Sequence, residues 1–415
     1  MVKNSSSILV IGFNTRPLAY SLKKAGYHVY AVDFFGDEDL YPSVDDCIIV
    51  TKELGANYHS IKGMYGKFLS KYSIDLLRKY SQINYLLIGS GLDDDISARE
   101  LILNEIKGDR YKVLSVNNDI ETIKNARNIT FVYKILKSKG YDIPHTENLE
   151  SYEDIHQEFK FPFILKKRSG SGGINVYKIT NETELSSFIA VQEDKSFKAE
   201  EWLIQEYIEG LPVSCTTISN GTDCEVVSIN RQIIGEKIVF APKDFMYCGN
   251  IVPANILKED EKIISKISEY LTQKLGLKGI NGFDFVLNNH YPYLMEINPR
   301  IPGSIRASEC SLNLNFLDLH IRSFYPMEWQ NIKNTVSSAK YKGFTTKLIM
   351  FSPKKVSTSQ IDKINKLEYI HDKSKPIRPI LKGEPLCTVL FKSNTFAKSY
   401  AGAIKVINKI KSIIV

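Results

Sequence analysis

Two apolar segments of the 415-residue chain carry acidic and amide side chains at alternating positions. Residues 282–287 include Asp284, and residues 293–298 include Glu296 and Asn298, with a polar turn between the segments. Because side chains on a strand alternate between faces, a hairpin formed by these segments places all three groups on one face. Like charges opposed across strands destabilise a sheet, whereas Mg²⁺ is commonly bound by carboxylate oxygens together with phosphate oxygens. The pattern therefore predicts a metal site formed by Asp284, Glu296 and Asn298.

The register of this hairpin depends on where its turn closes. If Leu287 and Tyr293 are the closing pair, Asp284 lies directly opposite Glu296. The second face is then apolar and is predicted to be buried, with these members: Phe283, Phe285, Met295 and Ile297. A solvated hairpin that carries acids by chance would not need such a face, so we interpret both strands as central.

A basic, glycine-rich stretch follows another apolar strand. Residues 163–165 lead into Lys166, Lys167 and Arg168, and then into the loop at 169–173, which reads SGSGG. Consecutive backbone N–H groups of such a loop can approach a phosphate chain closely. The spacing of a P-loop is absent, and a strand rather than a helix follows. Together with the acidic hairpin, the loop predicts a nucleotide site that has a metal clamp and a basic cradle.

The order and spacing of these motifs resemble the ATP-grasp superfamily over about residues 120–325. The segments that carry the resemblance are FPFILK at 161–166, IQEYIEG at 204–210, GFDF at 282–285 and MEINPR at 295–300. The chain is most similar to the uncharacterised archaeal carboligases related to biotin carboxylase, with which it shares GFNTRP at 12–17. The segment GEPLCTV at 383–389 resembles the C-terminal lobe of biotin-carboxylase-like members.

The resemblance implies that the protein binds ATP together with Mg²⁺ or Mn²⁺. It assigns the ATP contacts to a phosphate-binding lysine, the phosphate lid and the strand end that meets adenine: Lys166, Ser169, Gly170, Ser171, Gly172, Gly173, Gln205, Glu206 and Ile208. It assigns the metal to Asp284, Glu296 and Asn298, and it makes Arg300 and Asn298 the catalytic residues. Arg300 is expected to stabilise the transferring phosphoryl group or the acyl phosphate.

Two positions depart from the superfamily pattern. A lysine usually found near the start of the helix before Gly140 is replaced by Asn128-Ile129, and either Arg127 or Lys134 is left to substitute for it. The acid that commonly binds the ribose falls near Pro212, so that contact has no assigned residue.

The elements that must position these groups follow from hydrophobic periodicity. Strands at 8–11, 28–32, 86–88 and 113–116 alternate with helices at 18–25 and 96–106, which predicts a mostly parallel, doubly wound sheet. Residues 119–140 are predicted to be helical, and short strands with one helix at 259–275 follow from residue 161. A last unit has predicted strands at 347–351 and 387–391 and a basic helix from residue 397.

The predicted fold class is therefore α/β and α+β. A doubly wound pre-ATP-grasp domain is expected at 1–118 and an ATP-grasp fold at 119–328, with its lid subdomain at about 145–210. A small C-terminal α+β lobe is expected at 329–415.

Substrate choice is predicted to lie outside the nucleotide motifs, because ligands of doubly wound sheets bind beyond the carboxyl ends of the strands. Arg16 offers a cationic fork for a carboxylate or phosphate, and Asp93 offers an acid for an amine. Residues 240–253, which include Tyr247 and Asn250, are predicted to form a mobile loop that closes over them. The competing interpretation of Arg16 is a surface arginine at the start of a helix.

The resemblance implies a carboxylate–amine ligase that acts through an acyl phosphate and releases ADP and phosphate. An ATP-dependent carboxylase that uses bicarbonate is one alternative, and a non-catalytic nucleotide-binding regulatory protein is another. A dinucleotide-dependent dehydrogenase is rejected, because the turn at Gly12 lacks the G-x-G-x-x-G pattern.

Composition sets the remaining expectations. A hydrophobic content of 43% and a charged content of 24% are ordinary for a soluble globular protein. The net charge of +7 includes no dense basic block, and the six cysteines show no metal-binding spacing. We expect a cytoplasmic, archaeal-type enzyme with small-molecule carboxylate and amine substrates. Nucleic acid and membrane partners are not expected, and a homodimer is the oligomer considered.

Overall fold

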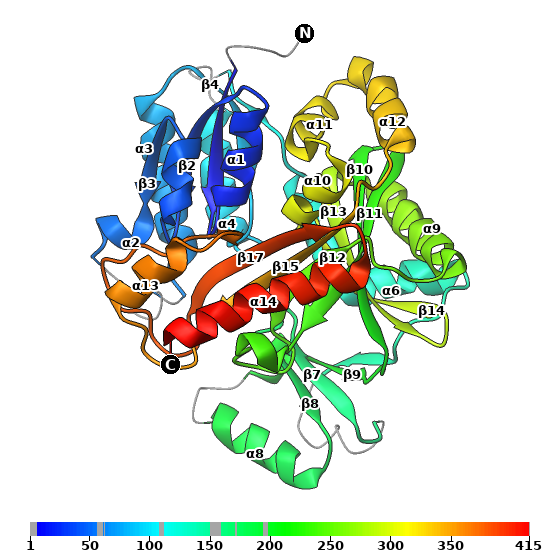
Figure 1. Cartoon of the computed structure of the whole chain (residues 1–415). Helices are drawn as coiled ribbons and strands as arrows, with labels where there is room; N and C mark the ends of the chain where they lie inside the picture. The colour runs from blue at the N-terminus through cyan, green and yellow to red at the C-terminus, as the bar shows by residue number, and fades with distance from the viewer. Residues whose placement is uncertain are drawn as a thin grey trace.

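The computed structural model describes residues 6–55, 61, 63–107, 112–149, 159–170, 172–193 and 198–414. Its strands form a five-stranded, a four-stranded and an eight-stranded sheet (Figure 1). None of the helices within these residues is long and apolar enough to cross a membrane.

The five-stranded sheet is parallel, with the order β3-β2-β1-β4-β5. Its strands are β1 (Ser7–Gly12), β2 (His28–Asp33), β3 (Asp46–Ile49), β4 (Ile83–Ile88) and β5 (Leu114–Ser115). Its helical segments are α1 (Arg16–Lys24), η1 (Glu38–Ser43), α2 (Val50–Glu53), α3 (Tyr65–Lys79) and α4 (Ile96–Ile106). The predicted doubly wound sheet is confirmed.

Both faces of this sheet are buried, as a parallel sheet requires. Ile8 and Val10 pack on one side in a cluster that also includes Leu18 of α1. Leu9 and Ile11 pack on the other side with residues of α3 and α4. Because the first cluster extends to residues 301–336, the parallel sheet is packed directly against the helices that follow β14.

Residues 119–140 form two helices, α5 (Ile120–Arg127) and α6 (Ile129–Ser138), instead of the single helical stretch predicted. The break falls at Asn128, whose side-chain oxygen accepts a hydrogen bond from the backbone N–H of Phe131 at 3.2 Å and caps α6. The break leaves Arg127 at the junction of the two helices.

The four-stranded sheet is antiparallel, with the order β6-β9-β7-β8. Its elements are β6 (Thr146–Asn148), β7 (Phe163–Lys167), β8 (Val176–Ile179), α8 (Glu182–Glu193), η2 (Ala199–Glu201) and β9 (Trp202–Glu206). Its core includes Phe163, Leu165, Trp202 and Ile204. This sheet and α8 form the lower part of the molecule in Figure 1.

The eight-stranded sheet has the order β14-β13-β10-β11-β12-β15-β17-β16. Its strands are β10 (Leu211–Asn220), β11 (Cys224–Ile234), β12 (Tyr247–Val252), β13 (Lys278–Asn288), β14 (Tyr291–Asn298), β15 (Phe344–Phe351), β16 (Ile370–His371) and β17 (Pro385–Ser393). Its helical segments are η3 (Lys237–Val239), α9 (Lys258–Leu275), α10 (Ile305–Leu312), α11 (Phe316–Arg322), η4 (Pro326–Glu328), α12 (Trp329–Ser338), α13 (Thr358–Asn365) and α14 (Phe396–Ile414).

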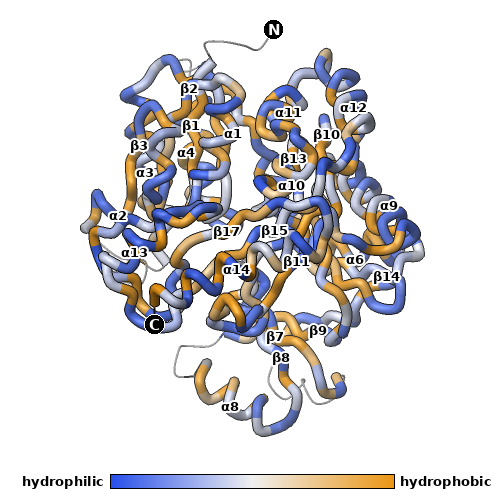
Figure 2. The backbone as a smooth tube through the Cα atoms, viewed as in Figure 1, coloured by the Kyte–Doolittle hydropathy of each residue, from blue (hydrophilic) through white to orange (hydrophobic). Residues whose placement is uncertain are grey.

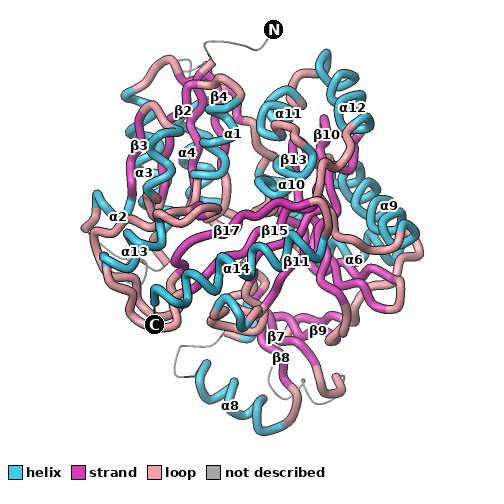
Figure 3. The backbone as a smooth tube through the Cα atoms, viewed as in Figure 1, coloured by secondary structure: helices cyan, strands magenta, loops and turns pink. Residues whose placement is uncertain are grey.

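The C-terminal strands continue the same sheet as β10 to β14, because β15 pairs with β12 on one side and with β17 on the other. Figure 3 shows α14 lying over β15 and β17. Hydrophobic and hydrophilic residues alternate along α14 (Figure 2), and its buried residues include Val406, Ile407 and Ile410. The helix therefore covers one face of this part of the sheet with a single apolar side.

The prediction of a mobile loop at 240–253 is wrong, because the second half of this segment is the central strand β12. Cys248 and Val252 are buried, and Asn250 is fully buried. Gly249 takes a φ of 134°, and a Cβ there would lie 2.0 Å from the backbone oxygen of Lys347. The glycine and the asparagine that indicated a loop are instead explained by close approach of β15 on one side and β11 on the other.

Candidate active site

The acidic hairpin consists of β13 and β14, and the predicted opposition of Asp284 and Glu296 is confirmed. The predicted closing pair is wrong: Leu287 lies opposite Pro292, and Tyr293 lies opposite Val286. The chain turns through Asn289 and His290, whose φ values are 45° and 65°. Positive φ at both central residues is typical of the tight turns that match the twist of a hairpin.

A β-bulge at Met295 corrects the register between this turn and the carboxylates. Phe285 lies opposite Leu294, and Asp284 lies opposite Glu296, so Met295 is the extra residue. Its side chain was predicted to be buried on the apolar face, but that place is taken by Leu294, which is 2% exposed. The bulge instead presents the Met295 carbonyl oxygen to the Lys166 ammonium at 3.4 Å.

The Asp284 carboxylate accepts hydrogen bonds from Gln232 and Asn298, each at 2.9 Å. Burial, and next the nearby charge of Glu296, raise the pKa of Asp284 to about 7 despite these bonds and Arg300. A divalent cation would offset both effects, so this donor set fits Mg²⁺. Among the described residues, no group of three or more His, Cys, Asp and Glu side chains is placed to hold a metal ion. A cation here would therefore also need the Asn298 oxygen and phosphate or water oxygens.

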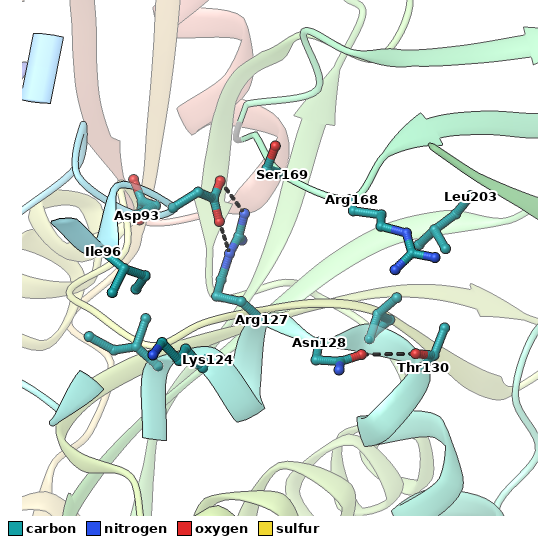
Figure 4. A pocket seen from close by; sticks show the side chains of 12 residues that line it. Asp93, Ile96, Lys124, Arg127, Asn128, Thr130, Arg168, Ser169 and Leu203 are labelled. Carbon is teal, nitrogen blue, oxygen red and sulfur yellow. Dashed lines mark hydrogen bonds and ion pairs between the residues drawn. The ribbon is translucent and has the colours of Figure 1, made fainter. Parts of the chain in front are cut away.

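Of the two candidates for the missing lysine, Arg127 lines the cleft beside Asp94, whereas Lys134 is exposed on α6. The Nε and Nη2 atoms of Arg127 contact the two carboxylate oxygens of Asp94 at 2.9 and 3.0 Å. It also forms an ion pair with Glu296 and donates to the backbone oxygen of Gly170 at 2.5 Å. Figure 4 shows Arg127 reaching from its helix end toward the loop that carries Asp93 and toward Ser169.

Lys166 and its neighbour Lys167 point to opposite faces of β7, as strand alternation predicts. The Lys166 ammonium lies 3.0 Å from the Gln205 side-chain oxygen, inside the cleft. Burial lowers the pKa of Lys166 to about 8, although the Glu296 carboxylate partly offsets that effect. Lys167 forms an ion pair with Glu201 at 2.8 Å on the other face.

The loop at residues 169–173, which is predicted to be the phosphate lid, contacts the rest of the site at both of its ends. The backbone N–H of Gly170 donates to Asp94 at 2.6 Å. The backbone oxygen of Gly172 accepts from Tyr247 N–H at 3.2 Å, and a Cβ on Gly173 would lie 1.7 Å from the Phe245 oxygen. Ser169 is exposed beside them, and Ser171 lies outside the described residues. Glycine at 173 is therefore required by close backbone packing.

The residues predicted to meet adenine lie at the end of β9. The Gln205 side chain is buried and donates to Tyr133 at 3.0 Å and to Thr146 at 2.8 Å. Glu206 is exposed and accepts from the backbone N–H of His145 at 3.1 Å. Ile208 follows the strand and is half-buried. The Gln205 side chain thus positions Lys166, and the adenine contacts of Glu206 and Ile208 stay predictions.

These groups border a continuous cleft. One part, of about 300 Å³, is lined by Asp93, Asp94 and the first residues of α6. The second part, of about 70 Å³, is lined by Lys166, the glycine loop and Glu296. Both parts share Arg127, Ile129, Arg168, Ser169 and Leu203. An apolar surface at Ile129 and Leu203, with basic groups at the rim, suits a flat base joined to a phosphate chain.

Arg300 forms a buried ion pair with Asp93, the acid predicted to bind an amine. Burial tends to raise the pKa of Asp93, but Arg300 and then Arg127 hold it below its usual value. Asp93 also accepts from the backbone N–H of Gly91 at 3.1 Å. The carboxylate after β4 therefore fixes the predicted catalytic arginine in place.

Arg16 is buried rather than on the surface, with a relative exposure of 4%. Its guanidinium contacts Asp372 at 2.5 Å and lies 3.5 Å from Asp39. Asn14, from the same GFNTRP segment, donates to Asp372 at 3.0 Å. The Arg16 guanidinium is thus engaged by one carboxylate that directly follows β16 and by another in η1.

Polar side chains on β12 and β15 lie next to each other in the eight-stranded sheet. Tyr247 donates to the Asn250 oxygen at 2.9 Å, and the Asn250 amide nitrogen is buried without a hydrogen-bond partner. Asn250 lies opposite Lys347 of β15, whose ammonium donates to the Gly303 oxygen at 2.9 Å. Lys347 was missed because nothing in the local pattern of β15 distinguishes it from an exposed strand lysine.

Comparison with known proteins agrees with this geometry. A model of the ATP-grasp domain family matches residues 126–304. An uncharacterised protein of Methanocaldococcus jannaschii is 29% identical over 396 residues, which cover 93% of this chain and 88% of the relative. A D-alanine–D-alanine ligase of Leptospira interrogans is 27% identical over 178 residues, which cover 40% of this chain and 49% of that ligase. The crystal structure of an L-amino acid ligase from Bacillus licheniformis superposes with a TM-score of 0.68 at 16% identity, covering 98% of each chain.

Residues 126–304 therefore contain an ATP-grasp domain, as the resemblance predicted. The predicted mixed architecture, with a parallel N-terminal sheet and antiparallel sheets, is also confirmed. The proteins that the chain matches over part of their length include D-alanine–D-alanine ligases.

Proposed function

We propose that the protein is an ATP-dependent carboxylate–amine ligase that activates its substrate as an acyl phosphate and releases ADP and phosphate. The observation that carries the proposal is the convergence of three cations on one acidic hairpin. Arg127 contacts Glu296, Lys166 reaches the bulge beside Glu296, and Arg300 lies near Asp284, where it offsets the raised pKa of that carboxyl. A polyanion that transfers its terminal phosphoryl group needs such a surplus of fixed positive charge.

Each group has a separate role in this proposal. Lys166 and Arg127 bind the phosphate chain, and the glycine loop covers it with backbone N–H groups. Asp284, Glu296 and Asn298 would hold Mg²⁺, which supplies charge neutralisation at the phosphate oxygens when bound. Arg300, held by Asp93, stabilises the negative charge that develops as the phosphoryl group moves.

The chemistry balances in two steps. A carboxylate oxygen of the substrate attacks the γ-phosphorus, the bond to the β-phosphate oxygen breaks, and ADP leaves with that electron pair. An amine nitrogen then attacks the acyl carbon, and phosphate leaves carrying the oxygen that came from the carboxylate. The amine loses a proton, and an amide remains. The bond type agrees with the names of the D-alanine–D-alanine ligase and the L-amino acid ligase to which the chain is similar.

Isotope transfer tests the proposal directly. Purified protein is incubated with ATP, Mg²⁺ and panels of ¹⁸O-labelled carboxylates and amines, and products are identified by mass. We expect ADP and phosphate in equal amounts, with one ¹⁸O atom in each phosphate. AMP with pyrophosphate would contradict the acyl phosphate. ADP formation that requires bicarbonate would support the carboxylase alternative, and nucleotide binding without turnover over the whole panel would support the regulatory one.

A further inference from the structure

A second cavity lies away from the nucleotide cleft, between the parallel sheet and the C-terminal strands. Its volume of about 720 Å³ exceeds that of both parts of the cleft, and it shares no lining residue with them. Its walls come from α1, α10, β15, β16 and β17. Segments from three distant parts of the sequence therefore enclose one space.

The cavity carries an excess of positive charge. Its lining includes Lys24, Arg306 and Lys392, together with the carboxylates of Glu309 and Asp318. Both carboxylates are already engaged, Glu309 with Arg306 at 2.6 Å and Asp318 with a neighbouring arginine of α11 at 3.4 Å. No carboxylate in the described part of the chain forms an ion pair with Lys24 or Lys392. The Lys392 ammonium donates one hydrogen bond to the Cys310 backbone oxygen at 2.7 Å, and an ammonium has three donors, so both lysines can still bind an anion in the cavity.

Arg306 adds a donor of fixed position. Its guanidinium lies over the Tyr20 ring, 4.3 Å from the ring centre, and one of its terminal nitrogens contacts Glu309. Its Nε atom is buried and has no hydrogen-bond partner. A buried N–H left without an acceptor is costly, and most such groups in proteins are satisfied. An anionic ligand in the adjoining cavity would supply the acceptor.

The rest of the lining is aromatic and neutral. The rings of Tyr20 and Tyr369 are both partly exposed, and His371 lines the cavity between the strands and α10. Burial lowers the pKa of His371 to about 4, so near neutral pH its ring offers a hydrogen bond and no charge. Aromatic surfaces beside a few convergent polar groups are typical of sites for small organic molecules.

We propose that this cavity is a second ligand site, which binds a small organic anion carrying a carboxylate or phosphate group. Arg306 Nε, Lys392 and Lys24 would contact the anionic group, and the tyrosine rings would contact the remainder. The proposal does not depend on the reaction catalysed in the nucleotide cleft, because it uses none of the residues assigned there.

Calorimetric titration tests the site with citrate and inorganic phosphate as probe anions. A non-hydrolysable ATP analogue is present at saturation, so that the nucleotide cleft is filled. The test variant carries Lys24→Gln and Lys392→Gln, and the matched control carries Lys398→Gln and Lys405→Gln on the exposed side of α14. Both variants lose the same charge, and neither changes the nucleotide cleft.

We expect wild type and control to bind at least one probe equally, and the cavity variant to bind it at least about tenfold more weakly. Arg306→Lys, which keeps the charge but removes Nε, is expected to weaken binding as well. Binding of neither probe to the wild type would overturn the proposal, as would equal losses in test and control variants. Sedimentation is measured in parallel. If the cavity variant changes the oligomeric state and not the probe affinity, the cavity is a subunit contact and the proposal is wrong.

Discussion

Three consecutive aspartates before α4 have three different partners, so their asparagine variants are expected to differ. Asp93 pairs with Arg300, and Asp94 holds Arg127 together with the glycine loop. Asp95 accepts from the backbone N–H of Ala98 at 2.9 Å and caps the helix. Each substitution removes one negative charge from nearly the same place. Differences between the variants therefore reflect the individual contacts of the three aspartates and not the general electrostatic effect of removing one charge.

The expected effect of Asp94→Asn on the KM for ATP follows from the contacts that the Asp94 carboxylate makes. It accepts two bonds from Arg127 and one from Gly170 N–H, and its side chain is 26% exposed. Hydrogen bonds to charged groups contribute roughly 1.5–3 kcal/mol, and partial exposure favours the lower end. A loss of about 1.5 kcal/mol corresponds to a rise of about tenfold in the KM for ATP. Asp95→Asn is the matched control, because asparagine caps helices about as well as aspartate.

Initial rates of ADP formation at varied ATP concentration measure these effects, with thermal unfolding as a check on folding. We expect Asp94→Asn to raise the KM for ATP, Asp93→Asn to lower kcat through the misplaced Arg300, and Asp95→Asn to change neither. The reasoning is refuted if Asp94→Asn and Asp95→Asn give the same KM for ATP, or if Asp93→Asn and Asp94→Asn alter the same constant.

Three further predictions concern single residues. Lys166→Ala should weaken ATP binding by about 1.5–3 kcal/mol in calorimetry. Lys167→Ala, which breaks an exposed ion pair with Glu201 on the other face of β7, should weaken ATP binding by less than about 1 kcal/mol. Equal losses of binding free energy in the two variants would refute the difference between the faces. Glu296→Gln should abolish Mg²⁺-dependent ADP formation while leaving the thermal midpoint nearly unchanged, and near-normal turnover would contradict the metal assignment. His320 is buried, its Nδ1 atom accepts from Ile280 N–H at 2.9 Å, and burial lowers its pKa to about 4. The unfolded state therefore binds more protons between about pH 4 and 6.5, and the free energy of unfolding should fall by up to about 3 kcal/mol as pH decreases through this window. Denaturant titrations of wild type and His320→Asn across this range should show a slope that is smaller in the variant by the contribution of His320, because His371, whose pKa burial also lowers to about 4, contributes in both proteins.

Local periodicity predicted the parts of the site that depend on one strand or one hairpin. The opposition of Asp284 and Glu296 and the divergence of Lys166 and Lys167 follow from alternation alone. The turn was misplaced by one residue because Asn289-His290 lacks the glycine that marks such turns. The error stayed local, since the bulge at Met295 restored the register before the carboxylates.

Other features of the site depend on contacts between segments that are distant in sequence, so no local sequence pattern predicted them. Arg127 was one of two candidates until the helix break at Asn128 placed it in the cleft. The partner of Arg16 is Asp372, more than three hundred residues away, and no spacing rule connects them. The strand at Tyr247–Val252 resembled a loop because its glycine and asparagine are explained only by the neighbouring strands.

The late position of β15 in the sequence affects how the large sheet forms while the chain is being synthesised. While a ribosome makes the chain, β10 and β11 can pair as soon as both have emerged, because they are adjacent in sequence. In contrast, β12 keeps an open edge until Phe344–Phe351 has been made, almost a hundred residues later. Unpaired strand edges in nascent chains bind other chains readily. Slow translation between α9 and β15 would lengthen this exposure, so chaperone dependence should be greatest for nascent chains stalled in that interval.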